Sequence, residues 1–178
     1  MLKGVKKMRS DWVAKGEILH ILASLQPENR LACEISLATG LRINDVLALT
    51  PQKVRKQRFT IREEKTGKTR LIRLPKELVD RALACSGQHY IFEGRLNGRT
   101  HRTRQAVFKD IKKAKANFGI KENLSVHSLR KAYAVDEYMK SGGNLKKVQK
   151  LLNHDSEAVT ILYAMANVIS KRKHFKKG

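Results

Sequence analysis

Four side chains in the C-terminal third of the chain could act on a phosphodiester. They are His127 and Arg130, in the string HSLR, and His154 and Tyr163, in LLNHDSEAVTILY. A guanidinium can hold the negative oxygens of a phosphate, an imidazole can move a proton or donate a hydrogen bond, and a phenol can attack phosphorus. Singly, each residue has an ordinary structural interpretation, and Tyr163 among its apolar neighbours fits a hydrophobic core.

The net charge of the chain indicates a polyanionic partner. The 178 residues include 38 Lys and Arg against 16 Asp and Glu, which gives a formal net charge of +22 at pH 7. Because such an excess repels itself within one compact domain, we expect binding to nucleic acid. Attachment to anionic lipid is the alternative, but the sequence shows no amphipathic anchor, no apolar stretch of membrane-spanning length and no signal peptide.

The two cysteines, Cys33 and Cys85, lie in apolar surroundings without the spacing of a zinc site or of a CxxC motif. We expect both thiols to be buried in a protein of the reducing cytoplasm. The sequence therefore predicts neither a disulfide nor a structural zinc site.

The elements that must position these residues are predicted to be mostly helical. Residues 1–9 are basic and lack a clear pattern, so we expect a flexible arm. Residues 10–178 are long enough for one domain with a buried core. Periodicity and capping residues predict helices from Ser10 or Asp11 to Gln26-Pro27, over 28–38, 43–49, 76–84, 103–117 and 126–140, from Asn144 to Leu152, and around Tyr163.

A change of period in the middle of the chain predicts a small sheet. Residues 58–63 and 70–74 alternate between polar and apolar types, and a charged turn at 65–68 separates them. A short strand around 53–55 would complete a three-stranded antiparallel sheet. The expected fold class is therefore α+β, mainly α-helical.

The order of these residues resembles the catalytic domain of the tyrosine recombinases, the phage-integrase family. ATGLRINDVLAL, which contains Arg42 and Asp45, is similar to the first arginine box of that family, and KTGKTR, which begins with Lys65, to its lysine-bearing hairpin. SVHSLRKAYA is similar to the second box and LLNHDSEAVTILYA to the last, where Tyr163 follows His154 at the family's spacing. The resemblance implies the fold of that catalytic domain.

The sequence departs from the family at three points. Asn153 precedes His154 where the family usually has glycine, and the run at 131–133 replaces a threonine- or histidine-containing run. The separate N-terminal core-binding domain that most members have is absent from the sequence. We therefore expect residues 10–178 to be the catalytic domain, either of a short member of the family or as a fragment of a longer protein.

The resemblance implies a site-specific recombinase that cleaves and rejoins duplex DNA through a 3′-phosphotyrosyl link, without a metal or nucleotide cofactor. Tyr163 would be the nucleophile, and Arg42 and Arg130 would clamp the non-bridging oxygens of the phosphate. Lys65 would be the general acid for the departing 5′-oxygen.

Supporting roles follow from the same resemblance. His127 would act as acid or base near the tyrosine, His154 would donate a hydrogen bond to a non-bridging oxygen, and Asp45 would orient Arg42 or its helix. The hairpin tip and the basic helix at 103–117 are candidates for DNA contact. The residues in question are Lys68, Arg99, Arg102, Arg104, Lys109, Lys112 and Lys113.

The resemblance also implies a homotetramer assembled on DNA. Two other functions stay open at this point. One is a non-catalytic DNA-binding regulator on the same fold, although the presence of all six catalytic-type residues argues against it. The other is a type IB topoisomerase-like enzyme, which shares the chemistry and differs in synapsis and site specificity.

Overall fold

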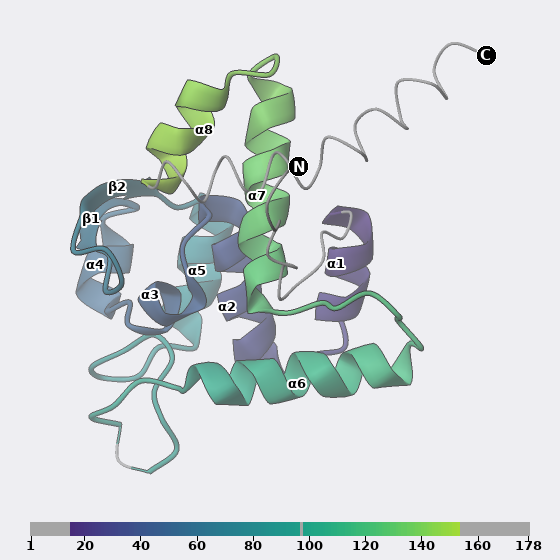
Figure 1. Cartoon of the computed structure of the whole chain (residues 1–178). Helices are drawn as coiled ribbons and strands as arrows, with labels where there is room; N and C mark the ends of the chain where they lie inside the picture. The colour runs from purple at the N-terminus through teal and green to yellow at the C-terminus, as the bar shows by residue number, and fades with distance from the viewer. Residues whose placement is uncertain (1–14, 97, 154–178) are drawn as a thin grey trace.

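The structure, a computed structural model, describes residues 15–96 and 98–153 of the chain (Figure 1). This part is mainly helical with one small antiparallel sheet, so the predicted α+β class is confirmed. The predicted arm at 1–9 and the helix predicted around Tyr163 lie outside the described residues. In chain order the elements are α1 Lys15–Leu22, α2 Pro27–Thr39, α3 Ile43–Leu47, α4 Pro51–Arg55, β1 Arg58–Arg62, β2 Thr69–Arg73, α5 Lys76–Ala84, α6 Arg104–Asn117, α7 Val126–Lys140 and α8 Leu145–Leu152.

Helices α2 and α7 pack against each other at the centre of the molecule (Figure 1). Helix α6 crosses beneath them and contacts α1, while α3, α4, α5 and the hairpin of β1 and β2 lie on the other side. Helix α8 packs on α7 at the end remote from α6. The main hydrophobic core collects apolar side chains from helices α1 to α7 and from both strands, so every element around the centre shares one interior.

The ends of α2, α7 and α8 lie where the sequence predicts them, because each depends on one or two neighbouring residues. Pro27 opens α2 at a position where its missing N–H has no helical partner to lose, and Gly40 ends α2 in the left-handed conformation, with φ at +66°. The side chain of Ser125 caps α7 by accepting a hydrogen bond from the backbone N–H of His127 at 3.3 Å. Asn144 caps α8 in the same way.

The hairpin buries charge as well as apolar side chains. Strands β1 and β2 pair antiparallel with Ile61 opposite Arg70. Because side chains alternate along a strand, Phe59, Ile61 and Ile72 face the core. The same alternation turns Arg70 and, one residue beyond β1, Glu63 toward the interior. The two charged side chains therefore reach the interior through strand geometry.

The predicted third strand around 53–55 is wrong. This segment belongs to α4, in which Pro51 takes the first helical position after the extended Thr50 and Val54 points into the core. The fixed φ of proline suits the first turn of a helix. A single polar–apolar–polar step is too short to distinguish a strand from a helical turn. Within the described residues the sheet has two strands.

The two thiols differ in burial, so one prediction about them is wrong. Cys33 is fully buried in α2, and this burial raises the pKa of its thiol. Cys85 follows the last residue of α5 and is exposed. Helix α5 buries Leu78, Val79 and Ala82, and the chain leaves the core just beyond them. Both thiols are free of disulfides.

Candidate active site

A cleft of about 390 Å³ lies where the N-terminal ends of α3, α6 and α7 approach the hairpin loop. Four residues that are predicted to be catalytic line it, namely Arg42, Lys65, His127 and Arg130. Arg42 is the N-cap of α3, and His127 lies in the first turn of α7. The N-terminus of α7 adds a partial positive charge that favours an anion. The fold therefore brings together four side chains from distant parts of the sequence.

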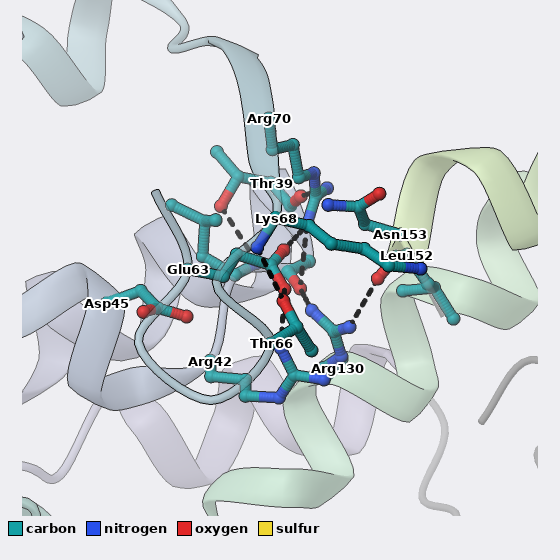
Figure 2. Close-up of polar contacts among 12 residues, drawn as sticks. Thr39, Arg42, Asp45, Glu63, Thr66, Lys68, Arg70, Arg130, Leu152 and Asn153 are labelled. Carbon is teal, nitrogen blue, oxygen red and sulfur yellow. Dashed lines mark hydrogen bonds and ion pairs between the residues drawn. The ribbon is translucent and has the colours of Figure 1, made fainter. Parts of the chain in front are cut away.

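Arg130 is the most deeply buried of the four, with 1% of its surface exposed. Its Nη1 donates to the carbonyl oxygen of Gly40, just after α2, and its Nη2 donates to the carbonyl oxygen of Leu152, at the end of α8, at 2.7 Å (Figure 2). A cation stabilises the carbonyl end of a helix, so one guanidinium joins α2, α7 and α8. The predicted catalytic residues His154 and Tyr163 lie beyond α8, outside the described residues.

Arg42 is held by a carboxylate that the motifs did not single out, that of Glu63. Nη1 of Arg42 donates to Oε2 of Glu63 at 2.6 Å, and Nη1 of Arg70 lies 3.5 Å from Oε1 (Figure 2). Glu63 is fully buried and Arg70 is 8% exposed, so water screens these charges little. The sequence did carry a signal for Glu63 and Arg70. Both occupy positions that alternate in phase with Phe59 and Ile61, so the strand pattern predicts that they point inward.

Gly40 is the point at which two of these arginines meet. Its carbonyl oxygen accepts hydrogen bonds from Nη1 of Arg130 and, at 3.4 Å, from Nη1 of Arg70. A Cβ on this residue would lie 2.3 Å from Cδ1 of the Tyr133 ring, and φ is +66°, so the position requires glycine. Tyr133 belongs to the run in which the sequence departs from the family, and burial raises the pKa of its phenol.

Asp45, which is predicted to orient Arg42 or its helix, bonds to the hairpin loop. Its Oδ1 accepts a hydrogen bond from the backbone N–H of Glu64 at 3.0 Å, and Nδ2 of the neighbouring Asn44 donates to Oε2 of Glu64 at 3.4 Å. Burial raises the pKa of the Asp45 carboxyl, while the hydrogen bond from Glu64 and the charge of Arg42 lower it. Asp45 thus ties the helix that begins after Arg42 to the loop that carries the lysines.

The hairpin loop is closed through Glu63. The backbone N–H of Glu63 donates to the carbonyl of Lys68 at 3.0 Å, and its own carbonyl accepts from the N–H of Gly67 at 2.8 Å. The hydroxyl of Thr66 donates to Oε2 of Glu63 at 3.2 Å. Lys65 is exposed and lines the cleft, whereas Lys68 is exposed without lining it. The loop therefore presents Lys65, and not Lys68, to the candidate active site.

Four of the seven residues predicted to bind DNA line one of two clefts, and these clefts share no lining residue. Arg104, the first residue of α6, lines the candidate active site. A second cleft, of about 490 Å³, lies between α2, α6 and the loop before α6, and is lined by Arg102, Lys109 and Lys113. The three other predicted residues are exposed and line neither cleft: Lys68, Arg99 and Lys112.

Arg102 has a structural partner in the second cleft. Its Nε donates to Oδ1 of Asn29 at 2.6 Å, and Nδ2 of Asn29 donates to Oδ2 of Asp110 at 2.7 Å. The same oxygen of Asp110 accepts the backbone N–H of Gln26 at 2.9 Å, at the N-terminal end of α2. This chain of hydrogen bonds joins the loop before α6 to α2, so Arg102 stabilises the fold whether or not it also contacts a phosphate.

Two absences apply to the part of the chain that the structure describes. In that part, no three His, Cys, Asp or Glu side chains gather as a metal site would require. None of its helices is both long and apolar enough to span a membrane. In the cleft of the candidate active site, the positive charge comes from Arg42, Lys65, Arg104 and Arg130.

The chain matches a known family over most of its length. The model of the phage integrase family matches residues 11–168. The integrase of Escherichia phage P2 is 25% identical over 168 residues, which are 92% of this chain and 47% of that protein. The tyrosine recombinase XerD of Rhizobium meliloti is 32% identical over 154 residues, which are 79% of this chain and 47% of that protein. The chain thus spans about half the length of these curated relatives.

Solved structures share the fold. A lambda integrase tetramer bound to a Holliday junction superposes with a TM-score of 0.73 and 22% identity, over 88% of this chain and 49% of that one. A crystal structure of XerA recombinase gives a TM-score of 0.68 and 20% identity, over 94% of this chain and 65% of that one. The predicted fold of a tyrosine recombinase catalytic domain is therefore confirmed.

Proposed function

Because the chain belongs to the phage integrase family, we propose that it cleaves and rejoins duplex DNA through a 3′-phosphotyrosyl intermediate on Tyr163. The observation that carries this proposal is the cleft that gathers Arg42, Lys65, His127 and Arg130. Negative charge grows on the phosphate oxygens when a nucleophile attacks phosphorus, and donors fixed in a shielded site stabilise that charge. These four side chains can bind the phosphate and transfer protons, which the transesterification needs besides the tyrosine.

Arg42 and Arg130 bind the non-bridging oxygens of the scissile phosphate in this mechanism. Both guanidiniums have fixed partners: Arg42 bonds to Glu63, and Arg130 bonds to the carbonyls of Gly40 and Leu152. Donors that are already oriented need little rearrangement as the transition state forms. Two planar cations can therefore provide the charge neutralisation that a metal ion supplies in other phosphoryl-transfer enzymes.

The two proton transfers fall to Lys65 and His127. A tyrosine in a model peptide has a pKa of about 10, so attack by Tyr163 at neutral pH requires loss of the phenolic proton. His127 takes part in that transfer from the first turn of α7. The phenolic oxygen then bonds to phosphorus, the bond from phosphorus to the 5′-oxygen breaks, and Lys65 gives this oxygen its proton. Rejoining reverses these steps, because the phosphotyrosyl ester keeps the energy of the broken bond.

The end of α8 supports the role proposed for His154. The carbonyl of Leu152 bonds to Arg130, and Nδ2 of Asn153 donates to the carbonyl of Thr69, on β2, at 3.4 Å. Asn153 has a φ of +55°, and asparagine tolerates this left-handed conformation better than most residues, which suits a position where the family usually has glycine. His154 is the next residue in the sequence after this helix end, which is bonded to the deepest arginine of the cleft.

We propose duplex DNA as the substrate and a homotetramer on DNA as the working assembly. The net charge of +22 favours a polyanionic substrate. Among the structural relatives, XerH is a site-specific recombinase bound to its difH substrate, and the lambda integrase tetramer is bound to a Holliday junction. Since the chain spans about half of its curated relatives, we assign it the part of the catalytic domain, over residues 10–178.

A nicked suicide substrate tests this function. Its cleaved strand loses a short fragment by diffusion, so that the covalent intermediate cannot be resealed. Duplexes built from candidate sites that flank the gene should give a protein–DNA adduct on denaturing gels, linked to the 3′-phosphate side of the break. Tyr163→Phe should abolish the adduct while leaving DNA binding nearly intact. An adduct that survives this substitution, or that is linked through a 5′-phosphate, would contradict the proposal.

A further inference from the structure

We infer that Glu63 is a positioning residue of this site, which holds the guanidinium of Arg42 and the loop of Lys65 in one fixed arrangement. This inference rests on the proposed function, since it assigns Glu63 a part in the same reaction. Glu63 belongs to none of the motifs that resemble the family boxes. Its place in the site follows from its contacts.

A guanidinium lies near each carboxylate oxygen of Glu63. Oε2 accepts a hydrogen bond from Nη1 of Arg42 at 2.6 Å, and Oε1 lies 3.5 Å from Nη1 of Arg70 (Figure 2). The residue has 0% of its surface exposed, so the two attractions act where water does not screen them. A guanidinium is planar, so a bond to one of its nitrogens sets the directions of its other donors. Glu63 thereby sets the plane in which Arg42 faces the cleft.

The same residue also fixes the loop that carries Lys65. Two backbone hydrogen bonds, from Glu63 to Lys68 and from Gly67 to Glu63, close the loop. The hydroxyl of Thr66 reaches back to Oε2 of Glu63, the oxygen that also accepts from Arg42. One carboxylate oxygen is therefore shared by the phosphate-binding arginine and the residue next to the proton donor. A displacement of Glu63 would move both groups with respect to a bound phosphate.

Burial makes a purely stabilising role a poor explanation for this carboxylate. Moving a charge from water into the protein interior costs several kcal/mol, and the attraction within a buried ion pair offsets about this cost. Apolar side chains of similar size therefore often stabilise a protein as much as a buried ion pair does. The inward position of Glu63 follows Phe59 and Ile61 along the strand register, where an apolar residue would suit the core. A carboxylate at this point has instead the chemistry that Arg42 and the hairpin loop require.

The chain offers a matched control in Glu34. Its Oε1 lies 2.8 Å from Nε of Arg30 and its Oε2 lies 2.6 Å from Nη2 of Arg81. It is therefore also a carboxylate between two guanidiniums, but it does not line the candidate active site. Glu34→Gln removes the same charge from the same kind of cluster and should leave cleavage unchanged.

The test compares Glu63→Gln, Glu63→Asp and Glu34→Gln in single-turnover adduct formation on the suicide substrate. A second substrate carries a 5′-thio leaving group, which departs without a proton. Glu63→Gln should slow cleavage of the ordinary substrate about 100-fold, because a misplacement of about 1 Å has that cost. On the 5′-thio substrate the loss should be smaller, since the misplaced Lys65 no longer matters there. Glu63→Asp, which keeps the charge, should recover part of the rate.

Several outcomes would overturn the inference. One is an unchanged rate in Glu63→Gln, and another is an equal loss on both substrates together with lost DNA binding, which would show a general structural defect. Thermal melting checks that each variant is folded at the assay temperature, and Glu63→Asp carries the comparison if Glu63→Gln is not. A wild-type chain that forms no adduct overturns the proposed function and this inference together. An active wild type with an insensitive Glu63→Gln variant removes the inference alone.

Discussion

Two clusters in this molecule have the same composition, one carboxylate between two guanidiniums. They are Glu63 with Arg42 and Arg70, and Glu34 with Arg30 and Arg81. The carboxylate of the Glu63 cluster is fully buried and its arginines are 9% and 8% exposed. In the Glu34 cluster the carboxylate is 12% exposed and the arginines are 44% and 38% exposed. The chemistry is alike, and the surroundings differ.

The difference shows how burial and position decide what an ion pair does. The Glu34 cluster joins α2 to α5 at the surface, where water and salt weaken it. The Glu63 cluster lies beside a cleft and connects the N-terminal end of α3 to the hairpin loop. Because little water reaches it, its charges interact strongly and any unpaired member is costly. The same three kinds of group thus link two helices in one place and join a helix end to the hairpin loop in the other, where we propose that they orient Arg42 for phosphate binding.

Arg130→Ala should give the largest effect on activity. Arg130 meets the Glu63 cluster at the carbonyl of Gly40, to which Arg70 also donates. Losing a fixed donor to the transition state should slow adduct formation by about 10³-fold. Arg81→Ala removes a guanidinium from the Glu34 cluster and should leave the rate unchanged. Single-turnover kinetics on the suicide substrate measure both variants, and equal losses would mean that the position of the charge does not matter.

Lys65→Ala should give the next largest loss of activity, and a substrate with a better leaving group should restore the rate. Loss of a general acid should slow cleavage by about 100-fold. A 5′-thio leaving group needs no proton, so it should restore the rate of Lys65→Ala but not that of Arg130→Ala. Failure of both variants on the 5′-thio substrate would remove Lys65 from the acid role and leave the loop held by Glu63 without its proposed purpose.

The two carboxylates should also differ in their effect on stability. Glu63→Gln should lower the free energy of unfolding by about 3 kcal/mol, because it leaves buried guanidiniums without their partner. Glu34→Gln should lower it by about 0.5 kcal/mol, as for an exposed pair. Urea unfolding monitored by circular dichroism measures both losses. Similar values for the two variants would show that burial does not separate the clusters as described.

Metal removal should give the smallest effect, namely none. In the proposed mechanism the arginines and lysine of the cleft carry the positive charge that a metal ion carries in two-metal nucleases. Adduct formation in excess EDTA should therefore match the rate without chelator. Loss of cleavage in EDTA with recovery on added Mg²⁺ would show that these cations do not suffice.

Local signals in the sequence predicted much of the fold. Gly40, Ser125 and Asn144 mark helix ends that depend on a few neighbouring residues, and the structure has those ends. Errors arose where the signal was short or the surroundings decided. The segment at 53–55 is helical because Pro51 begins a turn, and Cys85 is exposed because the chain leaves the core after α5.

Part of the site could not be predicted because it depends on contacts across the fold. Arg42 and Glu63 stand 21 positions apart and belong to a helix end and a hairpin, so no box contains both. Arg130 bonds to carbonyls 90 and 22 positions away, and backbone oxygens carry no sequence signal. The motifs indicated which residues could do the chemistry, whereas tertiary packing determined which side chains hold them.

The most direct test of the central claim is to identify the amino acid that carries the DNA in the trapped adduct. Nuclease treatment of the adduct, followed by proteolysis and mass spectrometry, locates the residue that keeps the phosphate. The account predicts a single phosphotyrosine at Tyr163, formed at equal rates with and without chelator. Attachment through Tyr133, Tyr138 or a serine, or the absence of any adduct on substrates that the chain binds, would contradict it.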